Sequence, residues 1–264
     1  MSSITTDQGI VHYEAIGHGP PVVLLHGWLG SWDLWQETMA YLGRNHRTYA
    51  LDFWGFGESG KKRESYAIED FVDLVDDFMN RLGIAQAPLV GHSMGGTVSL
   101  SVAIKYPQRV TKVAVAGSPI IGNSLSPLLK LAGYRGIAFA VYHLPFALRL
   151  GLRLASPIIT RERRWYKMIT RDISRTTLES FLLSIASLRR TDLRPRLGEI
   201  KVPTMGIYGP RDVIVHPNQW QPLEQGVPHA RIEIFERCGH FAMLDHPERF
   251  RLTLESFLDG VPPS

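Results

Sequence analysis

The sequence predicts an α/β fold in which a mostly parallel central sheet carries helices on both faces and a helical segment is inserted into the chain. Short apolar runs alternate with helical patterns over residues 1–117, the alternation stops over residues 118–200, and it resumes from residue 201. Alternating strands and helices build a parallel sheet that is covered on both faces. We therefore expect a core of residues 1–117 and 201–264 with an insertion of residues 118–200.

Each expected element follows from the spacing of its apolar residues. The expected strands are Val22–His26, Arg47–Asp52, Pro88–His92, Val110–Gly117, Pro203–Gly209 and Arg231–Phe235. The expected helices are Ser31–Leu42, Ile68–Leu82, Gly95–Lys105 and Pro247–Leu258. In the second of these helices, Phe71, Val75 and Phe78 recur at the spacing of one helical face. Asp245 and Glu248 have the spacing of a capping box, so we expect Asp245 to begin the last helix.

Residues 89–100 read LVGHSMGGTVSL and indicate a tight turn from strand to helix with Ser93 at its corner. Gly91 and Gly95 lie two positions from this serine on either side, where larger residues would keep the strand and the helix apart. The five residues match G-x-S-x-G, a strained corner that exposes a nucleophilic serine. The alternative is a glycine-rich turn with an incidental serine, because short motifs also occur by chance.

The composition limits the possible functions. The chain has 264 residues, of which 44% are hydrophobic and 20% charged, as in an ordinary globular protein. Its one cysteine, Cys238, excludes an internal disulfide framework and a cysteine-based zinc cluster. The stretch MSSITTDQG lacks the basic start and apolar run of a secretory signal, so we expect a cytoplasmic location.

The positive charge of the chain is concentrated in the expected insertion. Residues 118–200 hold 14 Lys and Arg against 5 Asp and Glu, a net charge of +9, whereas the remainder carries −5. A basic segment can bind nucleic acid, an anionic lipid surface or an anionic ligand, or it can be a solvated face. No helix-turn-helix, zinc-finger or RNA-binding signature accompanies it, so we expect no nucleic-acid partner.

A nucleophilic serine needs a base, usually a histidine that is oriented by a carboxylate. His240 lies just after the expected strand that ends at Phe235, and open α/β sheets place their sites at the carboxyl ends of strands. Asp212 likewise follows a strand and is the candidate carboxylate, although a solvated loop acid would have the same context. Asp245 is closer to His240 in the sequence, but the expected capping box already accounts for it.

With the order Ser93, Asp212, His240, the chain resembles the α/β-hydrolase superfamily along nearly its whole length. The motifs that carry the resemblance are His26-Gly27-Trp28, Asp52-Phe53-Trp54-Gly55-Phe56-Gly57-Glu58-Ser59, Gly91-His92-Ser93-Met94-Gly95-Gly96, Gly209-Pro210-Arg211-Asp212 and Gly239-His240. The resemblance implies the α/β-hydrolase fold, a catalytic triad of the three ordered residues, a helical cap formed by residues 118–200, and no metal or organic cofactor. It also implies an oxyanion hole from the backbone N–H groups of Trp28 and Met94.

The resemblance favours acyl transfer to water, because haloalkane dehalogenases and epoxide hydrolases of this superfamily use an aspartate at the corner and dienelactone hydrolases a cysteine. We expect a carboxylesterase or lipase-like serine hydrolase whose small-molecule ester substrate carries an apolar acyl or alkyl group. The residues expected to line its pocket are Leu29, Phe139, Phe146, Val213 and Phe241.

The sequence is also compatible with two other functions and with a membrane contact of the cap. Carbon–carbon bond hydrolases of meta-cleavage products resemble the chain in triad and cap, and basic cap residues would suit their anionic substrates. A hydrolase-like receptor that binds a ligand without turnover is the non-enzymatic alternative. We expect the cap to roof the pocket, with weak contact of its basic residues to an anionic membrane surface as the alternative.

Overall fold

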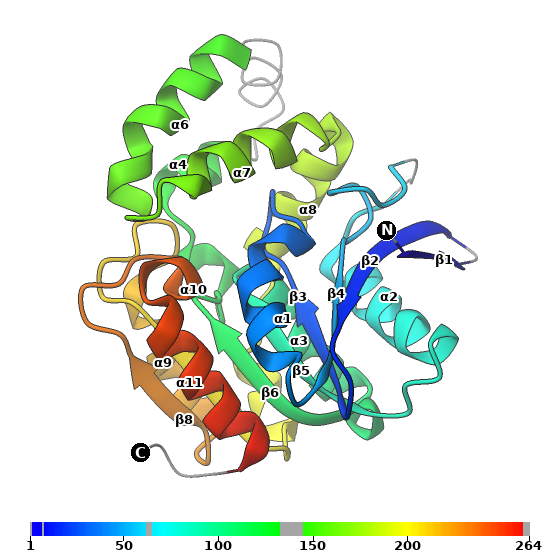
Figure 1. The fold of residues 1–264 in the computed structure, drawn as a ribbon. Coiled ribbons are helices and arrows are strands. Elements are labelled where there is room, and N and C mark those ends of the chain that lie inside the picture. Colours follow the sequence, from blue (N-terminus) through cyan, green and yellow to red (C-terminus); the bar gives the residue numbers. More distant parts are fainter. Residues whose placement is uncertain (1, 7, 62–64, 133–144, 261–264) are drawn as a thin grey trace.

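The computed structural model describes residues 2–6, 8–61, 65–132 and 145–260, and an eight-stranded sheet lies at its centre (Figure 1). The strands are Ser2–Thr6 (β1), Gly9–Ile16 (β2), Pro21–Leu25 (β3), Arg47–Leu51 (β4), Ala87–His92 (β5), Val110–Ala116 (β6), Thr204–Tyr208 (β7) and Arg231–Ile234 (β8). Their order across the sheet is β1-β2-β4-β3-β5-β6-β7-β8. Strands β3 to β8 pair in parallel, whereas β1 and β2 pair antiparallel at one edge. This arrangement confirms the predicted fold class.

Helices cover both faces of the sheet and enclose two hydrophobic cores. One core lies under Ile68–Arg81 (α2), Met94–Lys105 (α3) and Trp220–Gly226 (α9), and the other under Gln36–Leu42 (α1) and Pro247–Asp259 (α11). Strand β3 serves both cores, because successive side chains of a strand point to opposite faces. Val23 and Leu25 pack into the first core, and Val22 and Leu24 into the second.

The antiparallel edge is an addition that the sequence pattern did not predict. Strand β1 pairs with β2 from Ser2–Tyr13 to Thr6–Gly9, and β2 continues the sheet by pairing with β4. Their burial is mixed along both strands, and Ile10 remains exposed. An edge strand buries too little apolar surface to produce the continuous apolar run that marked the inner strands.

Residues 118–200, called the inserted segment from here on, contribute four α-helices in their described part. These are Pro127–Ala132 (α4), Pro145–Ile159 (α6), Arg164–Ser174 (α7) and Leu178–Arg190 (α8). Figure 1 shows them together above the carboxyl ends of the parallel strands, with α6 outermost. The exact division of the chain at residues 117 and 201 stays a prediction. Within the described ranges, no helix has both the length and the apolar character needed to cross a bilayer.

The start of the last helix differs from the expected capping box. Helix α11 begins at Pro247 and its N-cap is His246, while Asp245 ends the preceding short helix Ala242–Asp245 (α10). The Asp245 carboxylate instead accepts hydrogen bonds from the Gly239 N–H at 2.8 Å and from the Thr160 hydroxyl at 2.7 Å. The capping prediction was therefore wrong, because long-range donors occupy the carboxylate that local spacing assigned to the helix.

Candidate active site

Ser93 lies at the corner between β5 and α3 with a strained backbone, φ 52° and ψ −121°. Its N–H donates to the Ala116 carbonyl of β6 at 2.9 Å, which holds the corner against the sheet. A Cβ at Gly91 would come within 2.3 Å of the Gly95 carbonyl oxygen, and a Cβ at Gly95 within 2.3 Å of the Leu25 carbonyl oxygen. Positive φ at a non-glycine residue costs free energy and persists only where the surroundings enforce it. At this corner Gly91 and Gly95 let the neighbouring backbone segments pack closely enough to hold Ser93 in this conformation.

His240 and Asp212 form a buried hydrogen-bonded pair. The distance between His240 Nδ1 and Asp212 Oδ2 is 2.7 Å, and the two side chains are 4% and 3% exposed. The second oxygen of Asp212 accepts the N–H groups of Ile214 at 2.8 Å and Val215 at 2.9 Å, so its loop folds back onto the carboxylate. Backbone donors of this kind keep a buried carboxylate oriented. The pair leaves His240 Nε2 as the ring nitrogen that can exchange a proton with a nucleophile.

The corner at Ser93 lies against the loop that carries His240 (residues 235–241, called the histidine loop). His92, which precedes Ser93, places Nε2 3.1 Å from the His240 carbonyl oxygen, and the two rings lie 4.7 Å apart. A Cβ at Gly117, at the end of β6, would come 3.1 Å from His240 Nδ1. Burial, and secondarily the neighbouring His240, hold the pKa of His92 well below its usual value. A neutral His92 can therefore donate to the His240 carbonyl without placing a positive charge beside the His240–Asp212 pair.

The loop after β3 contacts the serine corner from the other side. A Cβ at Gly27 would come 3.1 Å from Ser93 Cβ, so the Gly27–Trp28 peptide adjoins the nucleophile. The Gly30 N–H closes the turn on the Gly27 carbonyl at 3.0 Å, and Leu29 has φ 60°. We call residues 27–31 the oxyanion loop. Met94, the other expected oxyanion donor, is fully buried as the first residue of α3.

His26 and Asp52 support this loop. Burial lowers the pKa of His26, whose ring bonds the Gly27 carbonyl through Nδ1 at 2.7 Å and accepts the Phe53 N–H at Nε2 at 3.0 Å. Asp52 accepts the Trp32 N–H at 2.7 Å. Both residues join the end of β3 to the end of β4, so they support the loop from within the core.

The five expected pocket residues have different outcomes. Phe241 packs beside the catalytic pair, with its ring 5.1 Å from that of His240, and Leu29 is buried in the oxyanion loop. Val213 is 47% exposed, because the loop turns back on Asp212 and leaves Val213 at its tip. Phe146 on α6 is 80% exposed, so it does not line an enclosed pocket as expected. Phe139 lies outside the described residues.

Two aromatic residues of the inserted segment reach the site although sequence reasoning did not select them. Trp165 of α7 is buried with its ring 5.8 Å from that of Phe241. Phe181 of α8 stacks on Trp28 at 4.6 Å, and its carbonyl accepts the Trp28 indole N–H at 3.3 Å. Both residues sit in helical patterns that predict ordinary packing, so no local signal distinguishes them from core aromatics.

Other nucleophiles and metal ligands do not converge on this site. Burial raises the pKa of the Cys238 thiol to about 12, and a buried thiol of this kind is unreactive. Among the residues that the structure describes, no three His, Cys, Asp or Glu side chains gather as metal ligands. Ser93, His240 and Asp212 thus remain the residues best arranged for nucleophilic chemistry.

The chain is similar to several known proteins over nearly its whole length. The model of a family described as alpha/beta hydrolase fold matches residues 20–247. A 2-hydroxy-6-oxo-6-phenylhexa-2,4-dienoate hydrolase of Burkholderia cepacia is 30% identical over 95% of this chain and 92% of its own length. A pimeloyl-[acyl-carrier protein] methyl ester esterase of Vibrio campbellii is 27% identical over 94% of this chain and 98% of its own. The solved structure of a Thermogutta terrifontis esterase superimposes with a TM-score of 0.84 at 24% identity, covering 98% of both chains.

Proposed function

The chain belongs to the α/β hydrolase fold family, and on that premise we propose that it is a serine hydrolase that cleaves carboxylic esters through an acyl-enzyme. The observation that carries the proposal is the buried 2.7 Å pair of His240 and Asp212, with His240 in contact with His92, the residue before a serine that is held at φ 52°. A serine at a strained corner, a histidine and an orienting carboxylate are the parts that acyl transfer needs.

The proposed reaction has two steps that use the same groups. His240 Nε2 takes the proton of Ser93 Oγ as the oxygen attacks the ester carbonyl, and the carbonyl oxygen becomes an oxyanion held by the N–H groups of Trp28 and Met94. The alcohol leaves with the proton from His240. Water then loses a proton to His240, attacks the acyl carbon and releases the acid and free Ser93. Asp212 stabilises the imidazolium that forms in both steps.

Part of the positive charge of the inserted segment is paired with the core, which supports a neutral substrate. Three of its arginines already pair with carboxylates of the core: Arg164 with Glu37 at 2.6 Å, Arg171 with Asp33 at 3.0 Å and Arg175 with Glu58 at 2.7 Å. Phe241, which packs against His240, and Trp165, which packs against Phe241, are uncharged. A pocket with such walls suits an apolar acyl or alkyl group.

Turnover of p-nitrophenyl esters of graded chain length tests the proposal. We expect hydrolysis by the unaltered protein, and a loss of about 10⁴-fold or more in Ser93→Ala, because the triad acts as a unit. A fluorophosphonate should label Ser93, which peptide mass spectrometry identifies. Retention of a tenth of the activity in Ser93→Ala would remove Ser93 as the nucleophile, and ligand binding without any turnover would favour a receptor.

Carbon–carbon bond hydrolysis is the second candidate, because the Burkholderia cepacia relative is named for a dienoate substrate. In such a reaction Ser93 Oγ, with its proton taken by His240, would attack the ketone carbon; the carbon–carbon bond would break, the dienol fragment would leave with that proton, and water would then hydrolyse the acyl-enzyme. The loss of absorbance of 2-hydroxy-6-oxo-6-phenylhexa-2,4-dienoate measures this reaction directly. A kcat/KM for the dienoate that exceeds the best ester value by 100-fold would replace the first candidate with the second.

A further inference from the structure

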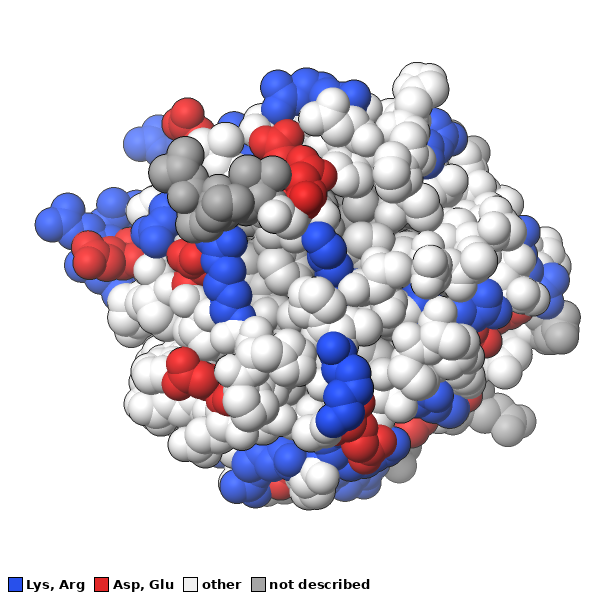
Figure 2. All heavy atoms as spheres, turned by 90° about the horizontal axis from the view of Figure 1, so that it is seen from below, with Lys and Arg blue, Asp and Glu red and all other residues white. Residues whose placement is uncertain are grey.

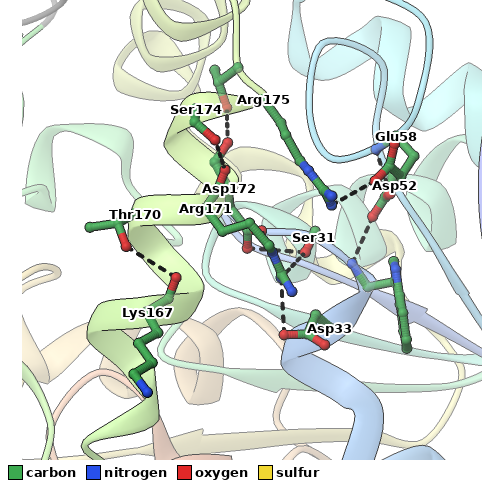
Figure 3. Close-up of polar contacts among 12 residues, drawn as sticks. Ser31, Asp33, Asp52, Glu58, Lys167, Thr170, Arg171, Asp172, Ser174 and Arg175 are labelled. Carbon is green, nitrogen blue, oxygen red and sulfur yellow. Dashed lines mark hydrogen bonds and ion pairs between the residues drawn. The ribbon is translucent and has the colours of Figure 1, made fainter. Parts of the chain in front are cut away.

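The oxyanion loop ends in a buried contact with the inserted segment. The Ser31 hydroxyl donates to Asp172 Oδ2 of α7 at 3.0 Å, and the two residues are 1% and 2% exposed (Figure 3). Ser31 is the N-cap of the 3₁₀ helix Trp32–Trp35 (η1), yet its side chain makes no capping bond to that helix. The Ser31 hydroxyl therefore bonds to α7 and does not cap η1.

Asp172 is itself held by its neighbour on the same helix. Arg171 donates to Asp172 Oδ1 from Nε at 3.0 Å and from Nη2 at 2.8 Å, and it reaches Asp33 of η1 at 3.0 Å. One turn further along α7, Arg175 pairs with Glu58 (Figure 3). The charged groups around the Asp172 carboxylate are thus the Arg171 guanidinium on its own helix and the Asp33 carboxylate on η1.

Stability does not explain why an ionised carboxyl lies here. Burial raises the pKa of Asp172 to about 6, against the opposing effects of Arg171 and Ser31. A buried ion pair is weak evidence for stability, and a perturbed carboxyl beside a reactive loop is a candidate for a functional role.

We propose that Asp172 is a positioning residue for the oxyanion loop: through Ser31 it keeps the Trp28 N–H aimed at the oxyanion. The loop is fixed at its start by His26 on the Gly27 carbonyl, and at its end by Asp172 on Ser31. Leu29 between these anchors has a strained φ of 60°, so release of one end lets the loop relax. This role for Asp172 rests on the proposed ester hydrolysis. It would mean that α7 of the inserted segment helps to position an oxyanion donor.

Asp172→Ala and Ser31→Ala test the proposal together with the conservative Asp172→Asn. We expect both alanine variants to lower kcat roughly 10- to 100-fold with KM changed less than about threefold, the size expected for a misplaced oxyanion donor. The double variant should be no slower than the slower single variant. Asp172→Asn should recover most of the loss, since its amide oxygen still accepts the Ser31 hydroxyl. Arg175→Gln, which breaks the neighbouring ion pair alone, is the matched control.

The rate of Ser93 phosphonylation separates this proposal from the proposed function. The reagent needs the same oxyanion donors but no turnover. If the unaltered protein reacts with the phosphonate and cleaves no ester, the ester assignment fails, and the variants still report on the loop. The role of Asp172 would be overturned if Asp172→Ala and Ser31→Ala lost no more kcat than Arg175→Gln does. It would also be overturned if their loss of kcat followed a fall in melting temperature, or if Ser93 of the unaltered protein did not react with the phosphonate.

A different observation concerns the outer face of α6. Phe146, Leu150, Leu154 and Ile158 recur every four residues along this helix and are 80%, 47%, 69% and 67% exposed. Residues at this spacing share one face of a helix, so they form an apolar stripe along it. Contiguous exposed apolar surface on a monomer marks an interaction site.

The charge beside this stripe is positive. Arg149 and Arg153 each follow a stripe residue by three positions, which makes them its neighbours on the helix surface. The sequence of α6, PFALRLGLRLASPII, contains no acidic residue. On the opposite face of the molecule, Lys and Arg side chains are interspersed with Asp and Glu (Figure 2). The arrangement on α6, apolar residues bordered by arginines, is that of a helix that lies in the interface of an anionic membrane.

We infer that α6 docks on an anionic lipid surface. The protein should co-sediment with vesicles of phosphatidylcholine and phosphatidylglycerol in equal parts, and added salt should weaken binding. Leu150→Ser with Leu154→Ser should lower binding roughly tenfold, whereas Leu252→Ser, which alters an apolar residue of α11 that is 52% exposed, should leave it unchanged. Equal binding to pure phosphatidylcholine would contradict the inference, and so would a dimer in solution that the stripe variants dissociate.

Discussion

Gly95 and Gly151 are both helical glycines, but they sit in different surroundings. A Cβ at Gly95, in the serine corner, would meet the Leu25 carbonyl oxygen at 2.3 Å, whereas a Cβ at Gly151, on α6, would meet no atom within 4 Å. The serine corner is defined by backbone segments in contact. The inserted segment is joined to the core by backbone bonds near its start, such as Ser126 N–H to the Ile214 carbonyl at 2.8 Å, but its helix α7 meets the core through side chains, such as the pair of Arg171 with Asp33.

The difference indicates how the two regions contribute to function. Backbone contacts allow the strand ends no adjustment, so they can hold Ser93 and His240 in one geometry. Side-chain ion pairs between partly exposed groups are individually weak and sensitive to salt. The ion pairs of α7 with the core should therefore be more sensitive to salt than the backbone contacts of the serine corner.

Asp212→Asn should produce the largest effect, because it acts on the rigid region. The amide cannot hold His240 in the productive tautomer, so we expect kcat to fall by about 10⁴-fold. Stopped-flow or steady-state ester hydrolysis measures the fall, and circular dichroism checks that the fold persists.

Asp245→Asn is the matched comparison for this carboxylate. Asp245 joins Gly239 of the histidine loop to Thr160 and Arg161 of the inserted segment, so an amide there loses acceptor capacity. We expect it to cost about 1–3 kcal/mol of stability and far less activity than Asp212→Asn. A larger loss of kcat in Asp245→Asn would mean that the carboxylate assignment is wrong.

Gly95→Ala and Gly151→Ala compare the two regions directly. The added methyl group at Gly95 has no room, so we expect a loss of about 3 kcal/mol or more in the free energy of unfolding, or insoluble protein. The same change at Gly151 should leave the protein as stable or raise its stability by up to about 1 kcal/mol, since alanine favours a helix. Urea unfolding measures both values, and equal effects would contradict the contrast.

The stability of the unaltered protein relative to Asp172→Asn should depend on pH. Because burial raises the pKa of Asp172 from 3.8 to about 6, the folded state binds a proton more tightly than the unfolded state. The unaltered protein should therefore lose stability relative to the variant as the pH rises from 4 to 6, by at most about 3 kcal/mol, and no further above that range. Melting temperatures of both proteins from pH 4 to 8 test the sign, and a variant that loses stability relative to the unaltered protein as the pH rises contradicts it.

Arg175→Gln should have the smallest effect. The Arg175 and Glu58 side chains are 37% and 39% exposed, so their ion pair is screened by solvent. We expect a loss of less than about 1 kcal/mol, which should disappear in high salt. Chemical unfolding at low and high ionic strength measures it, and a loss that persists in salt would indicate that this pair is more than a surface contact.

Local patterns in the sequence were sufficient to predict the inner strands, helices α1, α2, α3 and α11 and the serine corner, whereas helix α9 was not predicted. The apolar runs of β3, β5 and β6 follow from burial on both faces. Gly91 follows from a steric requirement within the corner, because a Cβ there would meet the Gly95 carbonyl oxygen, whereas Gly95 must also clear the distant Leu25 carbonyl of β3. His240 and Asp212 could be selected because both follow strands whose carboxyl ends share one edge of the sheet.

Tertiary structure alone decided the contacts between distant segments. Asp172 and Ser31 are 141 positions apart, and nothing in either neighbourhood indicates the other. Asp245 has the spacing of a helix cap, but its carboxylate is occupied by donors from a different loop and from the inserted segment. Phe146 has the composition of a pocket residue and lies on an outer face. Periodicity and motifs report which residues a chain can bury or expose nearby, whereas the partner of a buried polar group depends on which segments the complete fold brings together.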